Sequence, residues 1–155
     1  MSSQDRYFPG TSPPQSLTEN EVNLLWRVMV ARSVNVSSLK QISPVALAYL
    51  GDAVYELYIR TRYLLPPKRI SDYHQQVVTQ VRAETQAFHL QTLEPYLTDT
   101  EKEIVRRGRN AAKGCPRRLS PELYQQATSL EALLGYLYVQ NPQRLEDLLA
   151  KLALS

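Results

Sequence analysis

Cysteine is nearly absent from this chain of 155 residues. The single Cys115 excludes a disulfide framework and a thiolate zinc cluster, and it fits a reducing compartment. No segment reaches the ~20 consecutive apolar residues of a membrane span, and residues 1–16 contain no apolar signal core. We therefore expect a cytoplasmic protein that has no membrane partner. GxSxG, P-loop and GxGxxG motifs are also absent, so acyl transfer and nucleotide hydrolysis have no support.

Sustained alternation of apolar and polar residues, the mark of a half-buried strand, is missing as well. Helical spacing of apolar residues recurs instead, and the predicted fold class is all-α. With 43% hydrophobic residues, the chain can build one compact core and has little material for a second domain. We predict a disordered N-terminal tail over 1–16, a helical extension with its connection over 17–41, and the main domain over 42–155.

Capping residues and prolines predict where the helices begin and end. Ser43 before Pro44 is a typical helix start, and Pro66 with Pro67 ends that helix. Gly108 is expected to stop or bend a later helix, which leaves an exposed loop after it. The expected helices cover 17–32, 44–65, 71–93 as one helix or two abutting ones, 100–113 with the stop or bend at Gly108, 124–139 and 142–154.

Two isolated carboxylates lie in the two most apolar of these helices. Nearly every neighbour of Asp52 and Glu131 is Ala, Val, Leu, Ile, Tyr or Gly. A helix that is hydrophobic all round is expected to be buried, and a buried carboxylate must neutralise, pair with a cation or bind a metal. If the two helices cross near Gly51 and Gly135, where glycine permits a close approach, the two carboxylates meet.

This pair predicts a site for a hard cation. Carboxylates without a nearby histidine or thiolate pattern suit Mg²⁺, which supports phosphodiester chemistry. Glu56 lies four residues after Asp52 on the same helix face and is a third candidate ligand. Two alternatives stay open: Asp52 could pair with Arg60 or Arg62, and Glu56 could pair with Arg60 one turn on.

Basic residues cluster in one segment, although the net charge is only +3. Seven of the eighteen lysines and arginines lie between Lys102 and Arg118, against the single acid Glu103. Such a cluster is typical of a surface that binds phosphate backbones, and a solvated helix face is the alternative.

Three strings resemble one known family. YLGDAVYE (Tyr49 to Glu56) is similar to the signature helix of the ribonuclease III family, and SLEALLGYLY (Ser129 to Tyr138) is similar to its second acidic helix. The spacing of roughly 80 residues between the two acids suits that family's endonuclease domain. RRGRNAAKG (Arg106 to Gly114) resembles the compact Mini-ribonuclease III subfamily.

The resemblance implies a helical homodimer that cleaves double-stranded RNA with Mg²⁺ and leaves 5′-phosphate and 3′-hydroxyl ends. Asp52 and Glu131 would be the catalytic carboxylates and metal ligands, in the catalytic domain over 42–155. Only 24 residues follow Glu131, too few for a separate RNA-binding domain, so the catalytic domain itself is expected to bind RNA. The implied RNA-binding residues are Arg106, Arg107, Arg109, Asn110, Lys113, Arg117 and Arg118.

The subfamily further implies maturation of 23S ribosomal RNA precursor ends, with a ribosomal protein or the assembling ribosome as a candidate partner. The chain departs from the longer enzymes at two positions, where Ala48 and Thr128 replace carboxylates. Glu84 could supply a further acid, but a solvent-facing role is favoured. The absence of carboxylates at positions 48 and 128 keeps a second hypothesis open: a ribonuclease III-like module that binds RNA or the ribosome without catalysis.

Overall fold

Helices account for all regular structure in residues 34 and 36–154, which are the residues that the computed structural model describes. They are α2 (Val36–Leu39), α3 (Pro44–Tyr63), α4 (Ile70–Val81), α5 (Ala83–Leu93), η1 (Glu94–Tyr96), α6 (Asp99–Ala111), α7 (Pro121–Gln140) and α8 (Pro142–Leu149). The all-α prediction is confirmed. The tail over 1–16 and the expected helix over 17–32 lie outside the described residues. Within the described part, no helix has the length and hydropathy needed to cross a membrane.

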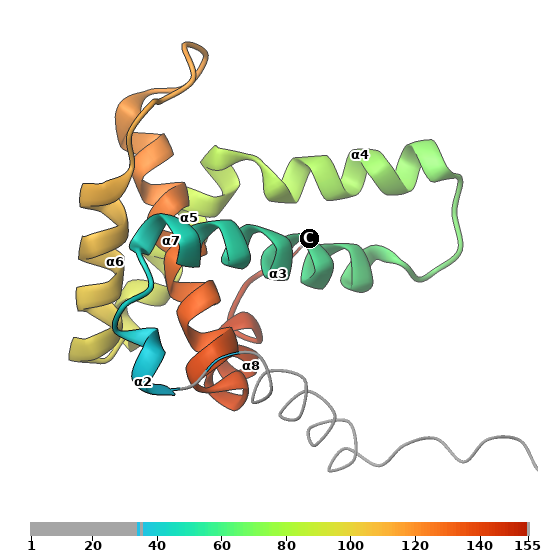
Figure 1. Cartoon of the computed structure of the whole chain (residues 1–155). Coiled ribbons are helices and arrows are strands. Elements are labelled where there is room, and N and C mark those ends of the chain that lie inside the picture. The colour runs from blue at the N-terminus through green and yellow to red at the C-terminus, as the bar shows by residue number, and fades with distance from the viewer. Residues whose placement is uncertain (1–33, 35, 155) are drawn as a thin grey trace, which may run out of the picture.

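The two long helices α3 and α7 cross near the centre of the molecule (Figure 1). Each begins with a serine cap followed by proline in the first turn, because the serine hydroxyl satisfies a free backbone N–H and proline needs none. Ser43 Oγ accepts from the Ala46 amide at 3.1 Å, and Ser120 Oγ accepts from the Leu123 amide at 3.2 Å. The helix starts therefore follow from local sequence, although α7 begins earlier than predicted.

The segment 71–93 forms two helices, one of the two outcomes that the sequence allowed. Arg82 separates α4 from α5 because its backbone is extended, with ψ of 155°. α4 runs beside α3, so the two form an arm with the connection 64–69 at its tip (Figure 1). α5 turns back against α7.

Gly108 does not end its helix, so the prediction of a stop there is wrong. α6 continues to Ala111, and Gly108 is buried within it. A Cβ added to Gly108 would lie 3.0 Å from the Ala132 Cβ and 3.1 Å from the Ser129 Cα of α7. This glycine serves close packing of α6 on α7 rather than chain reversal.

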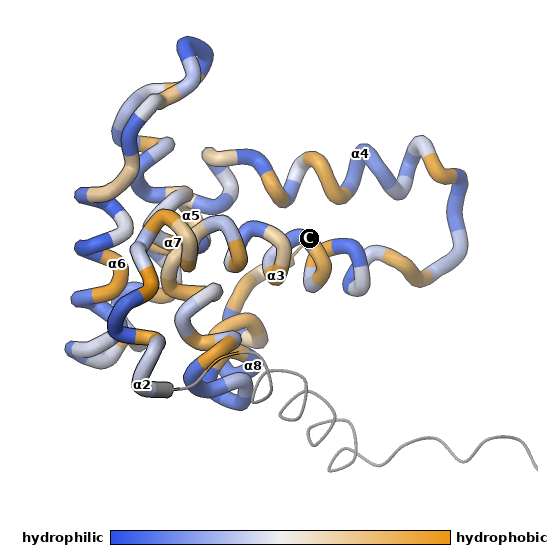
Figure 2. Tube along the Cα trace, in the orientation of Figure 1, coloured by the Kyte–Doolittle hydropathy of each residue, from blue (hydrophilic) through white to orange (hydrophobic). Residues whose placement is uncertain are grey.

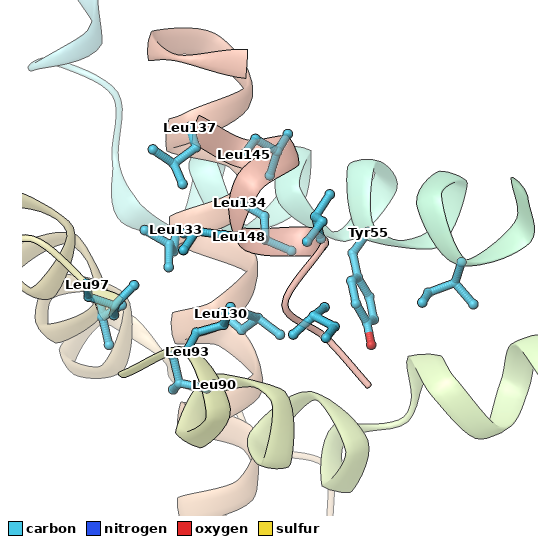
Figure 3. Packing of buried hydrophobic residues seen from close by; sticks show 14 of the residues in the cluster. Tyr55, Leu90, Leu93, Leu97, Leu130, Leu133, Leu134, Leu137, Leu145 and Leu148 are labelled. Carbon is cyan, nitrogen blue, oxygen red and sulfur yellow. The ribbon is translucent and has the colours of Figure 1, made fainter. Parts of the chain in front are cut away.

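Leucines around α7 form the main core (Figure 3). Leu130, Leu133 and Leu134 of α7 are fully buried, and they pack with Leu90 and Leu93 of α5 and with residues of α8. Each such side chain contributes about 1.5–3 kcal/mol relative to its exposed state. This packing fixes the orientation of α7 relative to its neighbours.

One face of α3 remains open, so the prediction of a helix buried all round is wrong. Tyr49 is 85% exposed and Leu57 is 55% exposed, whereas Tyr55 is fully buried. Apolar exposure continues at the arm tip, where Leu65 is 71% and Ile70 is 78% exposed. Figure 2 shows apolar colour along this arm. The apolar sequence of α3 is therefore explained only in part by burial within the chain.

Candidate active site

The crossing of α3 and α7 is made by two glycines, as the sequence predicted. A Cβ on Gly51 would lie 1.7 Å from the carbonyl oxygen of Glu131, and a Cβ on Gly135 would lie 2.0 Å from that of Leu47. Only hydrogen fits at either position, so the two backbones touch. The contact places Asp52, the next residue of α3, beside Glu131.

The two carboxylates differ in exposure, which corrects the prediction that both are buried. Asp52 is exposed and Glu131 is half-buried. Partial burial and the nearby Glu56 carboxylate raise the pKa of Asp52 above its usual value. Burial and the Asp52 carboxylate raise the pKa of Glu131 to about 7, and a hydrogen bond from Gln86 opposes that rise. The site therefore carries uncompensated negative potential.

Within residues 34 and 36–154, neither Asp52 nor Glu131 forms an ion pair, so no arginine of this part of the chain neutralises the negative potential of the site. Arg60, a candidate partner for Asp52, instead pairs with Glu56 at 2.5 Å between Nη2 and Oε1. The Glu56 alternative raised from the sequence is thus the arrangement observed. Two unpaired carboxylates with raised pKa values fit a divalent cation, which would relieve their repulsion.

The described residues add no further ligand from protein. They contain no group of three or more His, Cys, Asp and Glu residues that could hold a metal ion. Ala48 and Thr128 are both buried, and Thr128 Oγ1 donates to the Tyr124 carbonyl at 2.9 Å. Glu84 is exposed in the first turn of α5. Waters and phosphate oxygens would have to complete the coordination of a cation held by the pair.

Gln86 is a site residue that sequence reasoning missed. Its side chain is 3% exposed, and from the first turn of α5 it lies close enough to the Glu131 carboxylate to lower the pKa of that group. A glutamine in an amphipathic helix is usually a surface residue. Gln86 lies in the first turn of the helix that follows the break at Arg82, which the sequence left open, and no signal in the sequence marks it as buried.

The basic segment lies apart from the crossing, on the second half of α6 and the loop over 112–120. Arg109, Asn110, Lys113, Arg117 and Arg118 are exposed, and Arg107 is half-buried. Arg106 is exposed too, but it holds Glu103 in a bidentate ion pair with distances of 2.8 and 2.6 Å. The loop stands clear of the helices in Figure 1, and Figure 2 shows its tip as hydrophilic.

This loop leads directly into α7, on which Glu131 lies near the middle. The distance along the helix axis from Pro121 to Glu131 is therefore roughly 15 Å. Cations at the start of a helix and a carboxylate pair midway along it can contact one extended polyanion. Of the two histidines, His74 is exposed, and His89 is buried with its Nδ1 2.9 Å from the Tyr55 hydroxyl.

A helical domain with a carboxylate pair at a glycine crossing agrees with the family comparison. The Ribonuclease III domain model matches residues 45–142. A crystal structure of a protein from Fusobacterium nucleatum is similar to this chain with a TM-score of 0.66 and 31% identity, covering 70% of this chain and 90% of that one.

Two more similar proteins indicate the group within this family to which the chain belongs. The Mini-ribonuclease 3 of Synechocystis sp. is 55% identical over 138 residues, which cover 89% of this chain and 96% of the relative. The Mini-ribonuclease 3 of Synechococcus sp. is 59% identical over 121 residues, which cover 78% of this chain and 88% of the relative. The chain therefore belongs to the ribonuclease III family, within its Mini-ribonuclease 3 group. Membership makes it an endoribonuclease, of a family that acts on double-stranded RNA and generally depends on a divalent metal.

Proposed function

We propose that this endoribonuclease cleaves double-stranded RNA with Mg²⁺ held by Asp52 and Glu131. The observation that carries the proposal is the unpaired carboxylate couple at the Gly51–Gly135 crossing. Glu56 would join the ligand set only by leaving Arg60. A bound divalent cation supplies an activated water and neutralises charge on the phosphate.

The residues of the chain have distinct roles in this proposal. Asp52 is exposed and presents its oxygens where an RNA phosphate can approach. Glu131 is half-buried, and the packing of α7 fixes the position of the backbone that carries it. Hydrolysis at such a site would leave a 5′-phosphate and a 3′-hydroxyl.

The basic segment would bind the phosphate backbone of the duplex. Its cations contact phosphates without reading bases, so binding should be sequence-tolerant and should weaken as salt rises. The stronger candidates are the exposed cations that have no ion pair among the described residues, namely Arg109, Lys113, Arg117 and Arg118. Arg106, Arg107 and Asn110 complete the proposed surface.

We also propose that two copies form a homodimer through the open face of α3. Val45, Tyr49 and Leu57 lie on one side of that helix and are each at least half exposed. Apolar residues on one helix face are a recurrent dimer interface, and a two-fold pair would carry two sites, one for each RNA strand. Light scattering of the purified protein tests this: the mass should be twice 17.7 kDa.

The proposed natural substrate is the 23S ribosomal RNA precursor in the cytoplasm, with a ribosomal protein or the assembling ribosome as partner. Membership of the Mini-ribonuclease 3 group supports this, because the compact subfamily is associated with trimming those precursor ends.

Cleavage of a long labelled RNA duplex tests the activity. The protein should cut the duplex with Mg²⁺, leave it intact with EDTA, and leave single-stranded RNA of the same sequence uncut. End analysis should find 5′-phosphate and 3′-hydroxyl termini. Absence of cleavage across several divalent metals and duplexes, with retained RNA binding, would instead support a non-catalytic RNA-binding module.

A further inference from the structure

Gln86 links the α4–α5 break to the carboxylate on α7. It is the fourth residue of α5, and its side chain is 3% exposed. Its Nε2 donates to the Val81 carbonyl at 2.9 Å. Buried glutamine amides are uncommon because each of their polar atoms needs a partner.

The break at Arg82 creates the acceptors that hold this junction. The last carbonyls of a helix have no partner within it, so other groups must satisfy them. Four side chains do so here at the end of α4. Thr85 Oγ1 and Arg82 Nε donate to the Thr79 carbonyl at 2.7 and 3.2 Å, the Tyr55 hydroxyl donates to that of Gln80 at 2.8 Å, and Gln86 Nε2 donates to that of Val81. Gln86 is therefore anchored at its amide end.

The Gln86 amide also lies near the site. Nε2 carries two hydrogens, of which one goes to Val81, and the Gln86 side chain is close enough to the Glu131 carboxylate to lower the pKa of that group. Oε1 is buried and has no hydrogen-bond partner within the described part of the chain. An unsatisfied buried acceptor is costly, and a water is the usual partner of such an atom.

We propose that Gln86 is a positioning residue, which holds the Glu131 carboxylate in its productive orientation while its amide oxygen accepts a hydrogen bond from a water of the active site. The proposal rests on the proposed function, since it assigns Glu131 to the reaction. Ligand carboxylates are commonly oriented by such neutral hydrogen-bond partners, whose loss typically weakens metal binding or activity by about 10–100-fold.

Gln86→Met tests this, because methionine keeps the length of the side chain and removes its donors and acceptor. Thr85→Val is the matched control, since it removes a hydrogen bond of the same junction that does not involve Glu131. The Mg²⁺ concentration that gives half of the maximal thermal shift, measured without RNA, should rise about tenfold in Gln86→Met only. The single-turnover cleavage rate should fall in parallel.

A double variant separates positioning from general support of the fold. In a Glu131→Gln background, Gln86→Met should cause little further loss of cleavage or Mg²⁺ binding, because its effect passes through Glu131. Unchanged Mg²⁺ binding and cleavage in Gln86→Met would overturn the proposal, as would an equal loss in Thr85→Val.

Nuclear magnetic resonance keeps the proposal testable if Gln86→Met does not fold or if the parent protein does not cleave RNA. The side-chain amide signals of Gln86 should shift in Glu131→Gln and stay in place in Glu84→Gln, which changes an exposed acid of the same helix. Unshifted signals would contradict the contact itself. Shifted signals without any cleavage by the parent would leave the contact standing and count against the proposed function alone.

Discussion

The crossing of α3 and α7 and the loop over 112–120 differ in how their side chains are held. At the crossing, backbone touches backbone at Gly51 and Gly135, and Glu131 lies on a helix packed on several sides. In the loop, arginines project into solvent, and a Cβ on Gly114 would meet nothing within 4 Å. Chemistry needs side chains fixed to fractions of an ångström, whereas contact with a phosphate backbone tolerates mobile cations.

The largest expected effect separates the two regions by function. Asp52→Asn should lower the single-turnover cleavage rate by at least about a thousandfold, because it removes a carboxylate used in the reaction. Binding of duplex RNA, measured by filter retention, should stay within about twofold since the loop is untouched. Asp72→Asn, at an exposed acid of α4, is the control and should cleave normally. Normal cleavage by Asp52→Asn would remove this residue from the site.

The same substitution in each region tests the difference in rigidity. Gly51→Ala puts a methyl group into the backbone of α7, so it should destabilise the protein by more than about 3 kcal/mol in thermal denaturation. Gly114→Ala meets no atom, and only its φ of 73° opposes it, so about 1 kcal/mol is expected. Similar losses in the two variants would contradict a close crossing.

Stability as a function of pH tests the electrostatics of the crossing. The pKa of Glu131 rises from 4.5 to about 7 on folding, so the folded state holds this proton more tightly. The stabilising proton is fully bound below pH 4.5 and is lost as pH rises to about 7, so stability falls across that window. In EDTA at pH 8, the free energy of unfolding of Glu131→Gln should exceed that of the parent protein by on the order of 2 kcal/mol.

The difference in stability between Glu131→Gln and the parent protein should shrink as pH falls to 4.5, where the parent also carries a neutral side chain at position 131. Urea denaturation at several pH values measures it. A parent protein that is equally or more stable than Glu131→Gln at pH 8 would show that a cation from the protein compensates the carboxylate.

Single arginines of the basic segment should have the smallest effects. Arg109→Ala should weaken duplex binding several-fold and reduce the salt slope by about 1, without a change in the single-turnover rate at saturation. Arg106→Ala should weaken duplex binding less than Arg109→Ala does, because the Arg106 guanidinium already pairs with Glu103. If titrations at several salt concentrations gave the two variants equal effects, the ion pair would not govern RNA contact.

The start of α3 and the crossing were predictable because local chemistry determines them. Ser43 caps the helix that it precedes, and glycines at 51 and 135 mark where two apolar helices approach. The cap at Ser120 is equally local, but the prediction overlooked it and began α7 at Tyr124. Gly108 misled because glycine serves both helix ends and close packing, and only the position of α7 distinguishes these roles. Local sequence contains no information about that neighbour.

The site was predictable as a pair of acids but not in its surroundings. Asp52 and Glu131 stand out against apolar neighbours, whereas the exposure of Asp52 depends on which face of α3 the rest of the chain covers. Gln86 lies in the helix that follows the break at Arg82, and helix propensity leaves the choice between one helix and two undecided there.

A double-mutant cycle on cleavage tests the central claim, that Asp52 and Glu131 serve one site. Single-turnover cleavage of one labelled RNA duplex would be measured in Mg²⁺ for the parent, Asp52→Asn, Glu131→Gln and the double variant, with protein in excess. The two carboxylates act together in this account, so the double variant should be no slower than the slower single variant. Losses that multiply, or a single variant that cleaves as fast as the parent, would contradict it.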